Sequence, residues 1–261
     1  HLRKKFFVKT MSDVSQSKEN YLYDFITMCD LIVCAAMPRN EKETEKLGIT
    51  LNSIQEIKFN TKYILFDGAP ERATETQINN YSSLKQVFVK NSEFKVVEFK
   101  TNLYYKSMLE KFMRCCDIFN ELSDNLFIIQ DDVQLDKIDL VRVLKDKEDK
   151  EDCKILYFGE NRPKAPHWFE VISDDELFVQ THGWSERVWI IKKKDLIGIF
   201  NYLSTLIRGG CNGKFIEYYY QNKKKRKYWQ YLPEFKKLDY WSIWGCYEYK
   251  NVFHKHLVMK R

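Results

Sequence analysis

A buried strand that stops at two adjacent acids is the feature that most constrains this chain. Residues 126–129, Leu-Phe-Ile-Ile, form the uninterrupted apolar run of a strand that is buried on both faces. Gln130 follows, and then come Asp131 and Asp132. Two neighbouring carboxylates at the mouth of a buried strand repel each other and lose hydration, and a divalent cation would remove that cost. The alternative is that Asp131 only supports the turn after the strand, as aspartate does well.

Apolar runs alternate with amphipathic segments along most of the chain. Strands are expected at 31–36, 63–66, 95–99, 126–129, 155–158, 178–180 and 188–191, and helices at 41–57, 76–89, 102–122 and 195–207. Gly48 is a candidate for an earlier end of the first helix. Such alternation predicts an α/β fold, with an open mixed sheet and helices on both of its faces. No linker or internal repeat divides the sequence, so residues 1–261 are expected to form a single domain.

Composition limits the class of protein. Hydrophobic residues make up 44% of the 261 residues and aromatic residues 15%, so a substantial core can form and disorder is not expected. No apolar run approaches the roughly 18 residues that span a bilayer, and the apolar stretch at the start is too short for a signal peptide. The seven cysteines include no C-x-x-C pair, which favours reduced thiols in a cytoplasmic protein.

Polar and small residues collect where the expected strands end. The first strand ends at Ala36, and Asp67 and Gly68 follow the second. In an open α/β sheet, ligands bind beyond the carboxyl ends of the strands. Gly68 lets the backbone approach a ligand closely, and Asp67 can accept hydrogen bonds from a base or a sugar, although an ordinary turn is the alternative for this pair. We expect these residues to line one pocket with Asp131.

The sequence holds neither of the glycine-rich motifs, G-x-G-x-x-G and G-x-x-x-x-G-K-[ST], whose backbone cradles phosphates. A chain without them can still hold a diphosphate by a metal together with Arg or Lys. The candidates for that task follow strand ends or lie on the helix before the acidic strand: Arg39, Arg72, Lys106 and Lys111. A surface cation is the alternative for each. The net charge of +6 favours anionic ligands without singling out nucleic acid.

Three segments resemble the nucleotide-sugar-dependent glycosyltransferases of the GT-A fold. They are the strand end 66–70 (Phe-Asp-Gly-Ala-Pro), the segment 102–109 (Asn-Leu-Tyr-Tyr-Lys-Ser-Met-Leu) and the acidic motif 128–133 (Ile-Ile-Gln-Asp-Asp-Val). In that family a strand-terminal Asp-x-Asp, or a close variant such as Glu-Asp-Asp, holds Mn²⁺ or Mg²⁺ against the donor diphosphate. Here an amide, Gln130, stands in the place of the first acid, so the resemblance implies Asp132 and then Asp131 as metal ligands. The resemblance to this family covers about residues 29–200.

The resemblance implies a GT-A-like domain with a nucleotide-binding half, 1–125, and a metal and acceptor half, 126–261. The donor would be a nucleotide-sugar, with a UDP-sugar favoured, and the acceptor a hydroxyl of a glycan or glycoprotein. Small glycosyltransferases of large DNA viruses have a similar length and a similarly Lys-, Asn- and Tyr-rich chain, which suggests a viral enzyme of the host cytoplasm. The residues implied at the nucleotide-sugar are Ala36, Arg39, Asp67, Gly68, Tyr105, Lys106, Lys111 and Asp131.

Two further roles follow from the resemblance. An inverting transferase needs a base that takes the proton of the acceptor hydroxyl. Glu186 and Asp175 are the candidates, and a solvated loop acid is the alternative for each. His254 and His256 stand two residues apart, which places them on one face of a strand. A late histidine completes the metal site in some members of the fold, and His254 is taken for that role with His256 as a nearly equal alternative.

Two other classes of function remain open at this point. The segment 218–229 interleaves aromatic residues with the five cations 223–227, which suits nucleic acid or an acidic membrane surface. A solvated loop flanked by core aromatics is the more ordinary interpretation, so nucleic acid is not the favoured partner. A metal-dependent phosphotransferase or nuclease would also use Asp131 and Asp132. It would need further acids at neighbouring strand ends, where Asp67 is the strong candidate.

Overall fold

A computed structural model describes residues 29–38, 40–69, 72–90, 93–99, 118–160, 171–181, 187–196 and 245–257 of the chain. The strands are β1 (Cys29–Ala35), β2 (Lys62–Phe66), β3 (Phe94–Glu98), β4 (Asn125–Gln130), β5 (Val133–Leu135), β6 (Ile155–Glu160), β7 (Val171–Asp174), β8 (Phe178–Thr181), β9 (Val188–Lys192) and β10 (Cys246–His256). The helices are α2 (Glu41–Ser53), α3 (Glu75–Lys90), α5 (Leu140–Asp149) and the short 3₁₀ helix η1 (Phe119–Glu121). The fold is therefore mixed α/β, in agreement with the class expected from the sequence.

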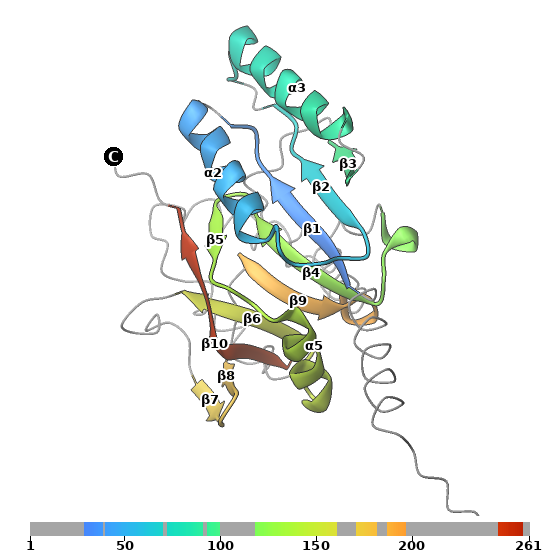
Figure 1. The fold of residues 1–261 in the computed structure, drawn as a ribbon, viewed down its shortest axis with the longest axis vertical. Coiled ribbons are helices and arrows are strands. Elements are labelled where there is room, and N and C mark those ends of the chain that lie inside the picture. The colour runs from blue at the N-terminus through green and yellow to red at the C-terminus, as the bar shows by residue number, and fades with distance from the viewer. Residues whose placement is uncertain are drawn as a thin grey trace, which may run out of the picture.

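The strands join in one ten-stranded sheet, in the order β3-β2-β1-β4-β9-β6-β10-β8-β7, with β5 paired to β10 beside this row (Figure 1). β1 runs parallel to β2 and β4, β2 runs parallel to β3, and β6 runs parallel to β10. β9 is antiparallel to both β4 and β6, so β4 and β6 point the same way. The parallel strands therefore end at one edge of the sheet, which we call the carboxyl edge.

The strand order reverses between β1 and β4. The chain adds β2 and β3 on one side of β1 and then returns to place β4 on the other side. In open α/β sheets the crevice at such a reversal, beyond the carboxyl ends of the strands, is where ligands bind. The residues that follow β1 and β4 therefore occupy the position that a ligand site is expected to take.

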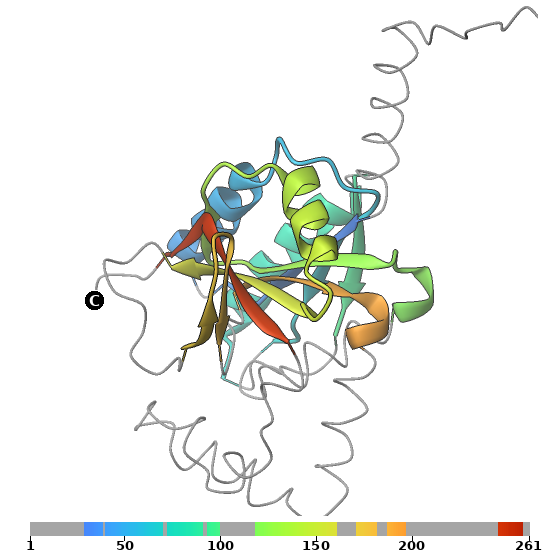
Figure 2. The same cartoon turned by 90° about the horizontal axis from the view of Figure 1, so that it is seen from below.

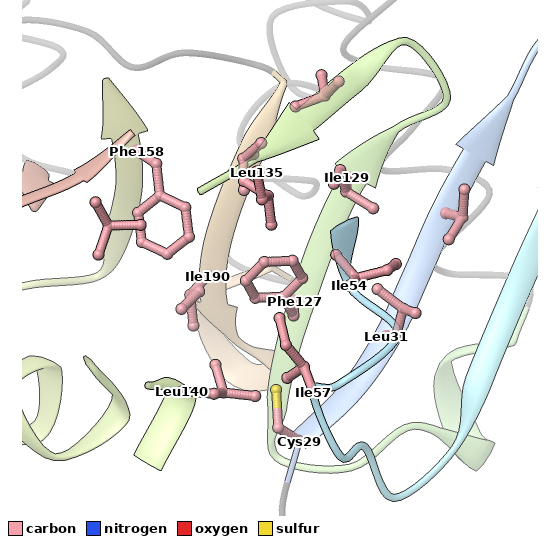
Figure 3. Close-up of a cluster of buried hydrophobic side chains, with 14 of the residues drawn as sticks. Cys29, Leu31, Ile54, Ile57, Phe127, Ile129, Leu135, Leu140, Phe158 and Ile190 are labelled. Atoms are coloured by element: carbon pink, nitrogen blue, oxygen red, sulfur yellow. The ribbon is translucent and has the colours of Figure 1, made fainter. Parts of the chain in front are cut away.

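Helical segments cover both faces of the sheet. α2, α3 and α5 lie on one face (Figure 2), where Leu47, Tyr81 and Leu144 join the larger cluster of buried side chains. Figure 3 shows part of this cluster, with side chains of β1, β4 and β6 packed near α2 and α5. On the other face, Ile118, Leu122 and Leu196 pack on β1, β4, β6 and β9. Each fully buried aliphatic side chain of this kind contributes about 1.5–3 kcal/mol, which explains the near-continuous apolar runs of β1 and β4.

α2 does not end at Gly48, and that expectation is wrong. The helix begins after Asn40, whose side chain accepts a hydrogen bond from the Glu43 N–H, and it continues to Ser53. Gly48 is exposed, and a Cβ placed on it would meet no atom within 4 Å. A glycine in a helix costs about 0.5–1 kcal/mol relative to alanine, which the burial of Leu47 and Thr50 on the opposite side outweighs.

The expected strands are all present, with ends within two residues of those predicted, whereas β5, β7 and β10 were not predicted. The helix expected over 76–89 is α3. Those expected over 102–122 and 195–207 lie largely outside the described residues. Within the described part of the chain, no helix is long and apolar enough to span a membrane.

Candidate functional site

The turn between β4 and β5, which consists of Asp131 and Asp132, lies at the carboxyl edge beside β1. The Asp131 N–H donates to the carbonyl of Cys34 at 3.2 Å. Asp131 Oδ2 accepts a hydrogen bond from the N–H of Ala36 at 2.6 Å. Both contacts join the end of β4 to the end of β1, at the point where the strand order reverses. Asp131 therefore fixes the two strand ends relative to each other. We call this turn the acidic turn.

Asp132 is directed toward the end of β10. Its Oδ2 lies 2.8 Å from Nε2 of His256, and its carbonyl accepts a hydrogen bond from the N–H of Leu257 at 2.8 Å. Burial acts to raise the pKa of Asp132. The His256 hydrogen bond and the charges of His256, Arg187 and Lys46 outweigh burial, so that this pKa lies below its ordinary value of 3.8. Asp132 is therefore held as a carboxylate at neutral pH.

One oxygen of Asp132 has no hydrogen-bond partner among the described residues. Oδ1 is buried, and no hydrogen bond to it is formed within the described part of the chain. An ionised oxygen in that position has lost its water without gaining a donor, which is a costly arrangement for a carboxylate. A cation or a donor group that reached Oδ1 would remove this cost.

Helix α2 holds the acidic turn in place through two hydroxyl groups on one of its faces. Thr50 Oγ1 accepts a hydrogen bond from the N–H of Val133 at 3.1 Å. Ser53 Oγ accepts one from the N–H of Leu135, also at 3.1 Å. These bonds fix β5 directly after Asp132, while β10 pairs with the other edge of β5. The turn is thus supported by a helix on one side and by a strand on the other.

The two histidines of β10 have different surroundings. His256 pairs with Val133 in β5 and contacts Asp132, as described above. His254 is fully buried, and its Nδ1 donates to the carbonyl of Phe158 in β6 at 2.8 Å. Burial, followed by the charge of Arg187, lowers the pKa of His254 to about 4, so its ring is neutral at pH 7. His254 Nε2 is buried and has no hydrogen-bond partner among the described residues. His256 is therefore the histidine in contact with Asp132, whereas His254 keeps a nitrogen with a free lone pair.

An arginine that the sequence analysis did not single out stands beside the acidic turn. Arg187 precedes β9, and its carbonyl accepts a hydrogen bond from the N–H of Gln130 at 2.9 Å. Its guanidinium forms an ion pair with Glu160, the last residue of β6. The positive charge of Arg187 acts on both Asp132 and His254. The only sequence signal for this residue is a cation directly before a buried apolar run.

Asp67 and Gly68 follow β2 at the same edge. The Asp67 N–H donates to the carbonyl of Ala35 at 2.9 Å, and the Asp67 carbonyl accepts a hydrogen bond from the Tyr81 hydroxyl at 2.7 Å. Burial raises the pKa of Tyr81, and the negative charge of Asp131 raises it further. The ends of β1, β2 and β4 therefore meet, and they bring together the predicted residues Ala36, Asp67, Gly68 and Asp131.

Asp175 has a structural role in the hairpin of β7 and β8. Its Oδ1 accepts hydrogen bonds from the N–H groups of Leu177 and Phe178, at 3.0 and 2.7 Å. Its Oδ2 lies 2.8 Å from Nζ of Lys150, and this contact, ahead of the backbone bonds, lowers the pKa of Asp175. The hairpin is separated from β4 by β9, β6 and β10. These contacts give no support to the prediction that Asp175 is a base near the acidic turn.

The remaining candidates lie outside the described residues: Arg39, Tyr105, Lys106, Lys111, Glu186 and the segment 218–229.

A metal ion fits the acidic turn only if a ligand completes its coordination. Among the described residues, no group of three or more His, Cys, Asp or Glu side chains could hold a metal ion. Mg²⁺ is commonly bound by one or two carboxylates together with substrate phosphates and water, rather than by a cage of side chains. Asp132 Oδ1, which has no partner among the described residues, provides one carboxylate ligand for such a site.

Comparison with known proteins adds no relative. A scan against models of protein families finds no match to this sequence, and a search of curated proteins finds none either. Function is therefore inferred from the residues and their geometry.

Proposed function

We propose that this chain is a metal-dependent glycosyltransferase of the GT-A type, which transfers a sugar from a nucleotide-sugar to a hydroxyl group of a glycan. The observation that carries the proposal is Asp132. It is an ionised carboxylate at the carboxyl edge, bonded to His256, with one buried oxygen that no described group satisfies. A ligand that brings a cation to this edge would satisfy that oxygen.

The ends of β1 and β2 offer the place for the nucleoside. Ala36, Asp67 and Gly68 lie there with their backbones fixed by Asp131, Ala35 and Tyr81. Open α/β sheets bind nucleotides in this crevice. The nucleoside would then lie on the β2 side of the acidic turn and its diphosphate over the turn itself.

The residues around the acidic turn suit the departure of a nucleoside diphosphate. Mn²⁺ or Mg²⁺ held at Asp132 Oδ1, with the other oxygen of Asp132 bonded to His256, would supply a Lewis acid that neutralises charge on the diphosphate. Asp131 keeps the turn in position through Ala36. Arg187, fixed by Glu160, adds a positive charge on the β9 side, where a planar guanidinium suits phosphate oxygens.

A thermal-shift screen tests the proposal. The protein is titrated with UDP-, GDP- and dTDP-sugars, each with and without Mn²⁺, and the donor that raises the Tm most is then assayed for turnover. We expect a shift that requires Mn²⁺, because the diphosphate completes the coordination, and release of the nucleoside diphosphate during turnover. Release of a nucleoside monophosphate would instead indicate a phosphodiesterase that uses the same acids.

Asp132→Asn is the variant that tests the site itself, because the amide keeps the size of the side chain and removes its charge. We expect the Mn²⁺-dependent shift to disappear while the unliganded Tm changes little. Asp136→Asn is the matched control, since Asp136 is an exposed aspartate just after β5. A metal-dependent shift of equal size in parent and Asp132→Asn, or no shift with any donor, would refute the proposal.

A further inference from the structure

Glu248 is a partly buried carboxylate in β10 that has no role in the binding described above. It pairs with Tyr157 of β6, which in turn pairs with Trp189 of β9, so the three side chains form a row on one face of the sheet. Tyr157 and Trp189 belong to the buried cluster that also contains Ile118, and not to the cluster with α2. Glu248 therefore points to the face of the sheet opposite α2.

Gly159 leaves room for the carboxylate of Glu248. A Cβ on Gly159 would lie 2.8 Å from Cδ of Glu248 and closer still to its Oε1, so any other residue there would displace the carboxylate. Gly159 is the next-to-last residue of β6, directly before Glu160, which holds Arg187. Glu248 thus lies near the start of β10, paired with Tyr157, and extends its carboxylate toward Gly159 and the carboxyl edge.

The surroundings of Glu248 suit a group that takes up a proton. Burial raises the pKa of Glu248, and the Tyr157 hydroxyl, 3.3 Å from Oε2, offsets only part of that effect. No described group bonds Oε1, and the residue is only half-buried. A carboxylate that is reachable and has a raised affinity for protons is what general base catalysis needs.

Other acids at or near the sheet ends are already engaged in contacts. Asp132 contacts His256, Glu160 pairs with Arg187, and Asp175 closes its hairpin with Lys150. Glu248 differs from them because its described partner is a neutral hydroxyl and because a glycine of the next strand clears a space for it.

We propose that Glu248 is the catalytic base that accepts the proton of the acceptor hydroxyl, an inference that rests on the glycosyltransferase function proposed above. In that step the acceptor O–H bond breaks and its proton moves to Oε1. The acceptor oxygen forms the bond to the anomeric carbon, and the bond from that carbon to the donor phosphate breaks, with its electron pair leaving on the nucleoside diphosphate. The acceptor would therefore bind on the sheet face opposite α2, beside β6 and β10.

The first test is Glu248→Gln, assayed with the donor that gives the largest thermal shift and with a panel of simple methyl glycosides as acceptors. Glutamine keeps the size of the side chain and can still accept from Tyr157. We expect transfer to fall about a hundredfold or more, the usual effect of removing a base, while donor affinity stays within about twofold. Glu151→Gln, an exposed glutamate in the loop after α5, is the matched control.

The second test uses Tyr157→Phe and the pH profile, because a purely structural carboxylate would not set that profile. The Tyr157 hydroxyl lowers the pKa of Glu248, so its removal raises that pKa further. A base is active above its pKa, so the acid limb of kcat against pH should move to higher pH in Tyr157→Phe and be absent from the residual activity of Glu248→Gln.

Each outcome decides between the alternatives. If the parent transfers sugar while Glu248→Gln stays within threefold of it, or if Tyr157→Phe leaves the acid limb unmoved, Glu248 is not the base although the glycosyltransferase assignment stands. If the parent transfers no sugar from any donor, both proposals are overturned together.

Discussion

Two carboxylates at opposite edges of the same sheet show how differently this chain uses a buried acid. Asp30 lies near the start of β1 and is fully buried. Its Oδ1 accepts hydrogen bonds from the Thr61 N–H at 2.9 Å and the Asn60 side chain at 3.1 Å, and its Oδ2 accepts one from the Ser123 N–H at 2.6 Å. Asp30 therefore joins the segments that lead into β2 and β4.

Asp132, at the carboxyl edge, is less buried than Asp30 but has fewer hydrogen-bond partners. One of its oxygens is bonded to His256, and the other has no partner within the described residues. The comparison suggests that Asp30 maintains the fold, because every contact it makes is internal, whereas Asp132 is kept ready for a ligand. Substitutions at the two edges should separate stability from binding.

The largest effect on stability is expected from Asp30→Ala. The substitution leaves the N–H groups of Thr61 and Ser123 and the side chain of Asn60 without their acceptor. Removing one partner of a buried hydrogen bond to a charged group costs about 1–3 kcal/mol, so the loss of three should lower the free energy of unfolding by about 3–5 kcal/mol. Urea denaturation measures it, with Asp136→Ala as the exposed control. If the free energy of unfolding fell by less than about 1 kcal/mol, Asp30 would not be a structural acid, and its contrast with Asp132 would not hold.

A smaller effect on stability is expected from Thr50→Val. This substitution should affect both the stability of the fold and the binding of ligand at the acidic turn. Valine keeps the shape of this buried side chain but leaves the Val133 N–H without an acceptor. We expect a loss of about 1–2 kcal/mol in unfolding and a weaker Mn²⁺-dependent thermal shift, because the acidic turn loses its support from α2. Gly48→Ala, on the exposed side of the same helix, is the control and should stabilise by up to about 1 kcal/mol. Undiminished binding in Thr50→Val would show that α2 does not position the turn.

The smallest effect on stability is expected from Asp132→Asn, and it should depend on pH. The pKa of Asp132 is lowered in the folded protein, so its contribution to stability is present above the ordinary value of 3.8 and is lost as pH falls through the folded pKa. Near pH 7 we expect a change within about 1 kcal/mol, because the amide can still accept from His256. Unfolding from pH 7 to pH 3 should show a shallower acid decline in the variant than in the parent, and identical declines would contradict this.

The sequence predicted the part of the fold that depends on apolar runs. β1, β2, β4, β6 and β9 are buried on both faces, so continuous Val, Ile, Leu and Phe residues mark them without knowledge of the tertiary structure. The meeting of Ala36, Asp67 and Asp131 followed from the same pattern, because parallel strands end at one edge.

β10 could not be predicted in this way. Its pairing with β6 shifts register between Tyr249 and Phe253, and Asn251 adopts a φ of 71°, so the alternation of faces breaks within the strand. The choice between His254 and His256 therefore depended on contacts with β5 and β6 that sequence spacing does not reveal. The same holds for Glu248 and its space over Gly159, which come from a pairing between strands distant in sequence.

The most direct test of the central claim is the position of a metal ion. Crystals grown with MnCl₂ and UDP would be examined by anomalous diffraction near the manganese edge. We predict one strong peak within coordination distance of Asp132 Oδ1, next to the diphosphate of UDP, and no such peak in Asp132→Asn. A manganese ion bound elsewhere with UDP, or UDP bound away from the acidic turn, would contradict the account.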